Sequence, residues 1–286
     1  MAPGAHDPQS VAMKPEAGSQ SGSSPSASPQ PPAGFSRADL LVTLAVLAAL
    51  AAVQLPSLAN SRHQANAALC LSSLDELTRA WRMYADDNEE VLVASGPGQN
   101  APDWTGGDWT GGFPSRNCSN LICSPLWRYT RRDIRVFACP DDPFTLSPNP
   151  RQGPHLRTRS MNSYLGGSSA WFTPSSGWRL FWNYADVEAP KPADAWVLID
   201  EREDSINDGS FVVDMTGYPN LQQTRLIDFP ADFHAQGAGI SFADGHAELK
   251  TWLDARTLVR TRIINTASPN NEEVRWLQER STSRLP

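Results

Sequence analysis

One long stretch near the beginning of the chain constrains the fold more than any other feature. It reads GFSRADLLVTLAVLAALAAVQLPSLANSRHQANAALCLSSLDELTRAWRMYADDNEE and begins at Gly34. Its residues from Leu40 to Val53 are all apolar except Thr43. After Pro56 the apolar residues recur at steps of three and four, which predicts a helix with one apolar face. We therefore expect one long helix, from about Ser36 to about Asp86, with a first half that suits lipid and a second half that packs on a domain.

The apolar first half has three explanations: a cleaved secretory signal, a simple membrane anchor, or the stem of a subunit that leaves the membrane. A membrane span needs roughly 20 apolar residues. That length is reached only if the count runs from Phe35 to Leu58 and includes the charged Arg37 and Asp39. Small residues at Ser57 and Ala59 would suit a signal peptidase, but the amphipathic pattern continues through that cleavage point. We expect the first half of the helix to be transmembrane.

The whole chain of 286 residues is long enough for one or two domains with a sizeable core. Its net charge of −7 leaves no basic stripe to neutralise phosphates, so we expect no nucleic-acid partner. Charged residues are few, while 24 Pro and 19 Gly favour a loop-rich, β-leaning domain. The expected fold class is α+β, with the long N-terminal helix packed on a loop-rich antiparallel β-sheet domain.

The first residues are rich in Ser, Pro, Ala and Gly and cannot bury apolar surface, so we expect a disordered leader there. The segment GAGISFADGHAELKTW predicts a hairpin whose strands are joined by Asp244-Gly245, a preferred pair for a tight turn with positive φ. The expected parts are the leader, the helix, a globular β-rich domain and a polar, frayed tail, at residues 1–34, 35–88, 89–268 and 269–286.

Two motifs at opposite ends of the chain resemble one known family. The segment GFSRADLLVTLAVLAALAAVQLP looks like the class III prepilin signal of type IV pilins and type II secretion pseudopilins. In that family a dedicated peptidase cuts after the Gly, here Gly34, and methylates the new N-terminal Phe, here Phe35. The segment HAQGAGISFADGH, with nine residues between His234 and Asp244-Gly245, looks like the His-x9-Asp-Gly signature of prepilin-type processing-associated proteins. LCLSSLDELTRAWRMYADDN and FACPDD also resemble that group.

The resemblance implies a structural pilin-like subunit of a type II secretion or type IV pilus-like envelope machine. The family's fifth mature residue is normally Glu and is here Asp39. A carboxylate is costly in lipid, and in a filament it could pair with the charged amine of the neighbouring subunit; the alternative is a charge among the lipid headgroups. The implied partners are the prepilin peptidase, other pilin-like subunits and the inner membrane. The chain would cross that membrane once, with its C-terminal domain in the periplasm or outside the cell.

We expect no enzymatic activity, because the sequence has no nucleophile elbow, HExxH motif, phosphate loop or dinucleotide-binding glycine pattern. The alternative function is a membrane-anchored or secreted carbohydrate-binding protein or hydrolase. Tryptophans could form a sugar-binding face, although such residues more often pack cores and loops; they are Trp104, Trp109, Trp127, Trp171, Trp178, Trp182 and Trp196.

Two segments are candidate metal sites. His234, Asp244 and His246 could ligate zinc, but they offer one nearby carboxylate and no third firm ligand. A hydrogen-bonded structural pair of His234 and Asp244 is the preferred interpretation. The acidic segment DEREDSINDG (residues 200–209) could hold calcium, although its spacing does not fit an EF-hand loop. We therefore predict no metal and no cofactor, with calcium as the alternative.

The chain has four cysteines and no CxxC pair. If the globular part lies outside the cytoplasm, its thiols meet an oxidising compartment. Proximity along the chain favours a disulfide from Cys139 to Cys118 or Cys123, whereas the family resemblance favours Cys70 with Cys139. A buried free thiol at Cys70, on the apolar face of the helix, is the alternative.

Overall fold

A computed structural model describes residues 34–96, 103–106, 118–143, 156–167, 177–259 and 265–286, apart from the side chains of residues 53–60 and 118–120. The expected leader, except for Gly34, lies outside the described residues. The chain divides into two compact units, Met1–Ala52 and Val53–Pro286. The boundary between the units therefore falls inside the first helix and not after it.

The first helix, α1, spans Arg37–Asp87 and confirms the long helix that the apolar pattern predicts. It begins with a capping box: the Asp39 N–H donates to Ser36 Oγ at 3.1 Å, and the Ser36 N–H donates to Asp39 Oδ2 at 3.0 Å. It ends before Glu89 and Glu90, whose φ values of 56° and 65° belong to the left-handed region that often terminates helices.

The expectation of a transmembrane first half is wrong, and so is the expectation of a single-pass inner-membrane protein. Among the described residues, no helix is both long enough and apolar enough to cross a bilayer. A span needs roughly 20 apolar residues, and the run after Thr43 is shorter. Five of the ten residues from 44 to 53 are alanine, which contributes little apolar surface.

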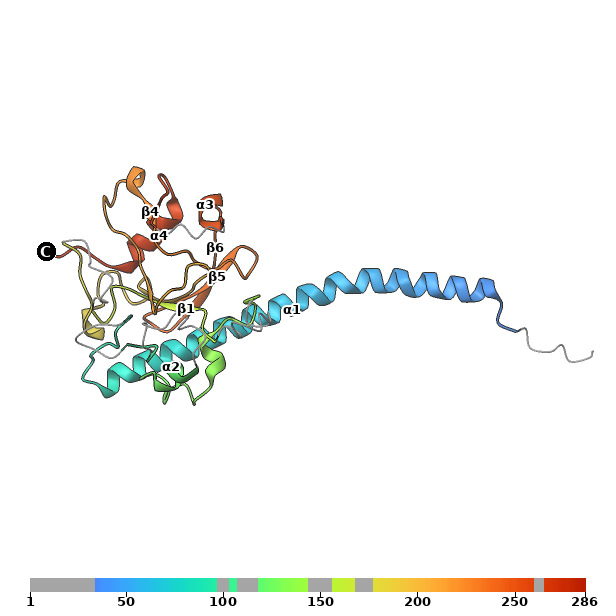
Figure 1. Cartoon of the computed structure of the whole chain (residues 1–286), viewed down its shortest axis with the longest axis horizontal. Coiled ribbons are helices and arrows are strands. Elements are labelled where there is room, and N and C mark those ends of the chain that lie inside the picture. The colour runs from blue at the N-terminus through green and yellow to red at the C-terminus, as the bar shows by residue number, and fades with distance from the viewer. Residues whose placement is uncertain (1–33, 97–102, 107–117, 144–155, 168–176, 260–264) are drawn as a thin grey trace, which may run out of the picture. The chain divides into compact units, whose positions relative to one another are not determined.

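The second unit is built on a five-stranded sheet with the order β3-β1-β2-β5-β6 (Figure 1). β1 pairs in parallel with β3, and the other neighbours pair antiparallel. The fold is α+β, but the sheet is mixed and not antiparallel as expected, because β3 returns beside β1 over a long connection. The strands are β1 (Arg159–Asn162), β2 (Trp196–Asp200), β3 (Ser210–Phe211), β5 (Gly237–Phe242) and β6 (Ala247–Thr251), and β4 (Arg225–Leu226) with β7 (Thr266–Ala267) makes a second, two-stranded sheet.

β5 and β6 form the predicted hairpin. The Phe242 N–H donates to the His246 carbonyl at 2.9 Å, so the connecting loop holds the three residues Ala243, Asp244 and Gly245. Of these three, only Gly245 has a positive φ, at 103°. The connection is thus a three-residue loop with glycine last, and not the two-residue turn that the Asp-Gly pair predicts.

The C-terminal segment, expected as a frayed tail, forms the helix α4 (Glu272–Ser281). The side chain of Asn271 caps its first turn. Leu277 is buried, and the Trp196 indole donates to Ser281 Oγ at 2.9 Å. The other helices are short: α2 (Cys118–Cys123), α3 (Ala255–Leu258) and the 3-10 helices η3 (Ile134–Phe137), η4 (Tyr184–Asp186) and η5 (Leu221–Gln223).

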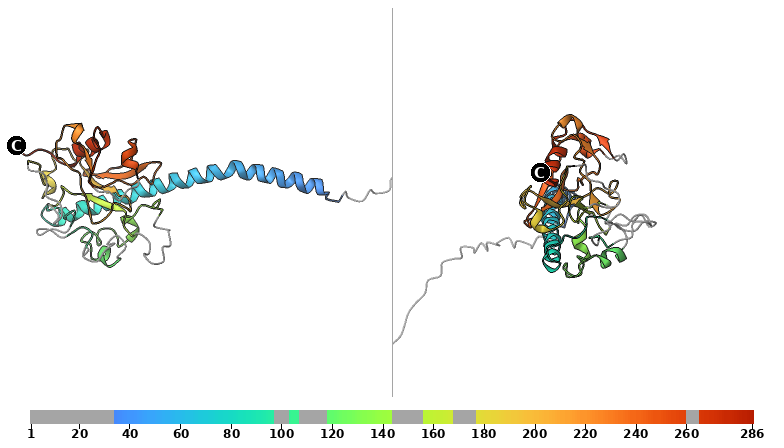
Figure 2. Two further views of the ribbon diagram at one scale, coloured as in Figure 1. Left: turned by 45° about the horizontal axis from the view of Figure 1, so that its top comes forward. Right: turned by 90° about the vertical axis from the view of Figure 1, so that its left-hand side faces the viewer.

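The part of α1 that belongs to the second unit and α4 lie on opposite faces of the sheet (Figure 2). Thr78 on α1 donates to Ser241 on β5 at 2.6 Å, while the next strand residue, Phe242, packs edge-on against Trp276 of α4. Successive side chains of a strand point to opposite faces, so the two contacts fix which face each helix covers.

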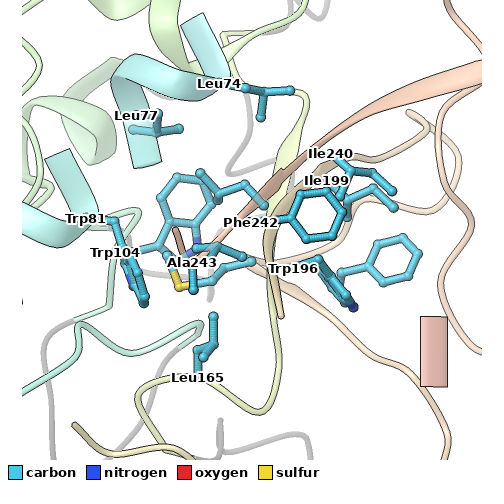
Figure 3. Packing of buried hydrophobic residues seen from close by; sticks show 14 of the residues in the cluster. Leu74, Leu77, Trp81, Trp104, Leu165, Trp196, Ile199, Ile240, Phe242 and Ala243 are labelled. Carbon is cyan, nitrogen blue, oxygen red and sulfur yellow. The ribbon is translucent and has the colours of Figure 1, made fainter. Parts of the chain in front are cut away.

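The hydrophobic core contains side chains from α1 and from the two central strands. Leu74, Leu77 and Trp81 of α1 are fully buried (Figure 3). The same core includes Ile199 of β2 and Ile240 of β5. The amphipathic second half of α1 is therefore packed on the domain, as its three-and-four spacing predicts.

Candidate functional site

Four polar side chains from four separate segments meet inside the second unit. Cys70 lies on α1, Cys139 follows η3, Asp200 ends β2, and His234 stands in the turn before β5. Their two sulfurs, one carboxylate oxygen and one imidazole nitrogen all lie within 4.8 Å of one another, and all four residues are buried. We call this group the Cys–Asp–His cluster. Within the described part of the chain, it is the group of ligand-type side chains close enough together to hold a metal ion.

Two contacts define the inner geometry of the cluster. Cys139 Sγ lies 3.1 Å from His234 Nε2, and the Cys70 thiol donates to Asp200 Oδ2 at 3.1 Å. Each sulfur therefore contacts an oxygen or nitrogen atom from a different segment. The cluster joins the helix, the central strands and the connection after η3 at one point.

The side chains of the cluster shift one another's pKa values. The contact with Cys139 lowers the pKa of the Cys70 thiol by more than burial raises it, and His234 acts in the same direction. The same contact, together with burial, raises the pKa of Cys139. Burial, and then the charge of Cys70, raises the pKa of Asp200. Burial lowers the pKa of His234, but the hydrogen bond and charge of Cys70 raise it overall.

A tight turn fixes the position of His234. Its N–H donates to the Gly237 carbonyl, and the Gly237 N–H donates back to the His234 carbonyl, both at 3.0 Å. The two residues between them, Ala235 and Gln236, have φ values of 49° and 68°. Positive φ at both central residues is the geometry of a type I′ turn and is uncommon for residues other than glycine. The backbone keeps this conformation while presenting the imidazole to the cluster.

The outer nitrogen of His234 faces a second carboxylate. His234 Nδ1 lies 3.2 Å from Asp141 Oδ2, an electrostatic contact without the alignment of a hydrogen bond. Asp141 is held in turn by Asn66 of α1, whose side-chain nitrogen donates to Asp141 Oδ1 at 2.5 Å. The exposed His63 also approaches Asp141 Oδ2, at 3.5 Å. Asp141 therefore places a carboxylate beside His234 on the side away from the cluster.

Arg159 on β1 neutralises part of the buried negative charge. It is fully buried, and its Nε donates to Asp200 Oδ1 at 3.4 Å. Its Nη2 donates to Ser73 Oγ at 2.9 Å and to the Cys70 carbonyl at 3.2 Å. A buried charge is tolerated when it is paired and hydrogen-bonded. Nη2 also donates to Cys70 Sγ at 3.7 Å, so Arg159 ties Asp200 to α1.

The absence of a side chain at Gly239 makes room for the cluster. A Cβ at this position would lie 2.8 Å from Asp200 Oδ2, 3.2 Å from Cys70 Sγ and 2.5 Å from Leu74 Cδ1. The Gly239 N–H also approaches Asp200 Oδ2, at 3.3 Å. Only a residue without a side chain gives β5 this close approach to α1.

The segment with the family-like processing motif is accessible in the structure. Gly34 is exposed, and a Cβ added there would meet nothing within 4 Å. Phe35 is 79% exposed. Asp39 is also exposed, and its hydrogen bonds from the Ser36 side chain and backbone lower its pKa. The predicted cleavage point and carboxylate are thus both open to a partner.

The C-terminal motif residues do not meet one another. His234 precedes β5 and Asp244 follows it, so the whole strand, about 20 Å at 3.3 Å per residue, separates them. Asp244 pairs instead with His246, whose Nδ1 lies 2.6 Å from Asp244 Oδ1. The expected structural pair of His234 and Asp244 is wrong, as is the zinc site of those two residues with His246. Gly245 closes the hairpin loop.

The acidic segment 200–209 does not converge on one point. Asp200 belongs to the Cys–Asp–His cluster, and Glu201 Oε1 accepts from Ser205 Oγ at 2.7 Å. Asp204 pairs with Arg202 at 2.5 Å. Because these carboxylates interact with different partners, the segment does not form the set of converging oxygen ligands that calcium requires.

The cysteines are placed differently from the expectation. Cys123 is an exposed free thiol and Cys139 a buried free thiol, so the structure has no bond between them. The side chain of Cys118, the other proposed partner, lies outside the described residues. Cys70 is a buried free thiol on α1, next to Cys139 in the cluster.

Four of the five described candidate tryptophans pack in or against the core. Trp104 and Trp196 are fully buried, and Trp127 and Trp178 pack against the core. Trp182 is 37% exposed. The remaining candidates for a sugar-binding face, Trp109 and Trp171, lie outside the described residues.

Sequence reasoning singled out His234 but missed its partners. Cys70 was recognised as an apolar-face residue and as a disulfide partner for Cys139, and Asp200 only as part of an acidic segment. Three sequence features could have indicated the cluster: a cysteine in the helix, another before a proline, and a histidine before a glycine-rich strand. Comparison with models of known protein families, with curated proteins and with solved structures found no match to this chain.

Proposed function

We propose that the chain is a structural, pilin-like subunit of a type II secretion or type IV pilus-like machine. In this proposal a prepilin peptidase cuts after Gly34 and methylates Phe35, and the mature chain assembles with other pilin-like subunits through the start of α1. The observation that carries the proposal is the exposure of the apolar residues of α1 up to Ala52.

The exposed apolar surface surrounds this part of the helix. Leu40, Leu41 and Val42 are each at least half exposed. Successive helical residues are about 100° apart, so these three already cover about 200° of the circumference. Leu44 and Leu47, at 52% and 56% exposure, continue the surface along the axis. A helix that is apolar all round requires burial on every side.

This arrangement favours assembly into a filament over a closed dimer. A single partner covers one side of a helix and leaves the others in water. Several neighbouring copies can cover all sides, and repeated head-to-tail contacts that do not close on themselves form a helical filament. Copies of the same apolar segment are therefore the occupants that we propose for this surface.

The charged residue at the helix start fits the same proposal. Cleavage after Gly34 would leave a charged amine on Phe35, next to the positive end of the α1 dipole, where a cation is unfavourable. Asp39 is exposed and ionised at neutral pH, because its pKa is lowered. Its carboxylate can offset that amine within one subunit or between neighbours.

The test compares two polar substitutions on the same helix. Leu44→Gln lies in the proposed assembly surface, and Met83→Gln, at a residue of similar exposure (50%), lies outside it. The full chain is co-expressed with a prepilin peptidase, and the concentration at which it forms pelletable filaments is measured by sedimentation and electron microscopy.

We expect Leu44→Gln to raise the required concentration by about tenfold or more. Burying a leucine side chain contributes about 1.5–3 kcal/mol, and 1.4 kcal/mol is a factor of ten. Met83→Gln should leave it unchanged. Equal behaviour of the two variants, or a wild-type chain that stays monomeric after processing, contradicts the proposal.

A further inference from the structure

We propose that the Cys–Asp–His cluster binds one zinc ion, with Cys70, Cys139, Asp200 and His234 as its four ligands. Thiolate sulfur, imidazole nitrogen and carboxylate oxygen are the donors that zinc takes in proteins, and four of them make the tetrahedral set of a structural site. This inference goes beyond the proposed function, because it concerns how the second unit is held together and not how subunits assemble.

The distances in the cluster fit a tetrahedral ion. With zinc bonds of about 2.3 Å to sulfur and about 2.0 Å to nitrogen or oxygen, neighbouring ligand atoms lie about 3.3–3.8 Å apart. The four ligand atoms lie within 4.8 Å of one another. The two closest pairs, Cys139 Sγ to His234 Nε2 and Cys70 Sγ to Asp200 Oδ2, are both 3.1 Å apart. Shifts of well under 1 Å would place every ligand at a bonding distance from a central ion.

The charges balance with a divalent cation. Two thiolates and the Asp200 carboxylate carry three negative charges, and the buried Arg159 beside Asp200 supplies one positive charge. A zinc ion supplies the remaining two. The side chain of Arg159 interacts with Asp200 Oδ1 at 3.4 Å and with Cys70 Sγ at 3.7 Å, so its positive charge lies beside two of the proposed ligands. Asp200 Oδ2 is the oxygen that faces Cys70.

The surroundings of the ligands match those of metal sites. A metal-bound histidine commonly directs its other ring nitrogen at a carboxylate or carbonyl, which orients the ring. His234 presents Nε2 to the cluster and Nδ1 to Asp141 Oδ2 at 3.2 Å. The other ligands are supported as well: Thr158 Oγ1 donates to Asp200 Oδ1 at 3.3 Å and accepts from the Cys139 N–H at 2.8 Å.

The site is closed and therefore structural. All four ligands are buried, and the protein supplies a complete ligand set, which leaves no position for a substrate. The ion would join α1 to the connection after η3, to β2 and to the turn before β5. Free energy of metal binding at such a site is also free energy of folding.

Two rival accounts use the same residues. In the first, Cys70 and Cys139 form a disulfide; in the second, the thiols only hydrogen-bond to Asp200 and His234, with no ion. The disulfide would engage both sulfurs and release His234 and Asp200 from them. The three accounts predict three different masses. Only the zinc account predicts bound metal, and only the disulfide account predicts the loss of two thiols.

The test uses the full chain, purified without chelator from cells grown with zinc. We expect one zinc ion per chain by native mass spectrometry and by elemental analysis. Cys139→Ser should lose the zinc, whereas Cys123→Ser, at an exposed thiol outside the cluster, should keep it. Chelator treatment should lower the unfolding temperature of the wild type and of Cys123→Ser.

A second measurement needs no variant and so does not depend on the folding of one. Replacing zinc with Co²⁺ in the wild-type chain should give thiolate-to-cobalt charge-transfer absorption and the visible bands of a tetrahedral site. Wild-type protein without stoichiometric metal, a mass lower by two hydrogens from a disulfide, or cobalt bound without charge-transfer bands would each overturn the proposal.

Discussion

Gly239 is the residue that most directly decides how closely β5 approaches α1. Its missing side chain leaves the space in which Asp200, Cys70 and Leu74 meet. The strand sequence GAGISF shows that a glycine is present but not what it faces, because the facing atoms come from α1 and β2. Single residues of this kind are recognised only when the tertiary contacts are known.

Gly239→Ala should therefore destabilise the second unit. The added Cβ would lie 2.5 Å from Leu74 Cδ1 and 2.8 Å from Asp200 Oδ2, so these atoms must move. Overpacking of this kind typically costs about 1–3 kcal/mol, measurable by urea unfolding. Gly34→Ala is the control, because a Cβ there meets nothing within 4 Å and should leave the free energy of unfolding unchanged. An unchanged midpoint for Gly239→Ala would refute the packing argument.

Asp228 provides a prediction about pH. It is fully buried, and burial raises its pKa from the ordinary value of 3.8 to about 8. The folded chain therefore keeps a proton on Asp228 over a range in which the unfolded chain has lost it. Unfolding releases that proton, so the stabilising contribution is complete below about pH 4 and is lost as the pH rises through about 8.

Asp228→Asn removes this titration and keeps an oxygen that can accept from the Val212 N–H, as Asp228 Oδ2 does at 2.7 Å. We expect the free energy of unfolding of the wild type to fall relative to the variant between about pH 5 and about pH 8, by up to about 1.4 kcal/mol per pH unit. Urea titrations at several pH values measure the two slopes. Parallel slopes for the two proteins would show that Asp228 is ionised in the folded chain.

At the scale of elements, α1 combines two different surfaces in one helix. Its residues from 40 to 52 are exposed and, apart from Thr43, apolar. Leu74, Leu77 and Trp81 are instead buried in the second unit. Both surfaces follow from local sequence periodicity, which is why the extent of the helix was predicted to within a residue. The predicted membrane-spanning role is wrong, because the alanine-rich run falls short of a bilayer's thickness.

Two variants at the start of α1 can separate the two roles proposed for Asp39, which are charge pairing and helix capping. Asp39→Asn removes the charge but keeps an oxygen for the capping box with Ser36, while Ser36→Ala removes the Ser36 hydroxyl from the box and keeps the charge. If the carboxylate offsets the N-terminal amine, Asp39→Asn should assemble poorly and Ser36→Ala normally. Filament yield after peptidase processing measures this. The reverse order of yields would assign Asp39 to helix capping alone.

At the scale of the whole molecule, local patterns predicted local structure and failed where distant residues meet. The β5–β6 hairpin was found because its signal lies within sixteen residues. The Cys–Asp–His cluster was not, because Cys70 and Asp200 are 130 positions apart and Cys139 and His234 are 95 apart. α4 was missed because its few apolar positions stand among charged ones, and its burial depends on contacts with β2 and β5.

The central claim is that the apolar start of α1 becomes the N-terminus of a mature subunit. The direct measurement is intact-mass and N-terminal mass spectrometry of the full chain co-expressed with a prepilin peptidase. We predict a chain that begins at a methylated Phe35, reduced in yield in Gly34→Ala and blocked in Gly34→Arg, because the proposed peptidase would need a small residue at the cleavage point. An intact N-terminus with active peptidase, normal maturation of Gly34→Arg, or a chain that begins at Asn60 after signal-peptidase cleavage would contradict the account.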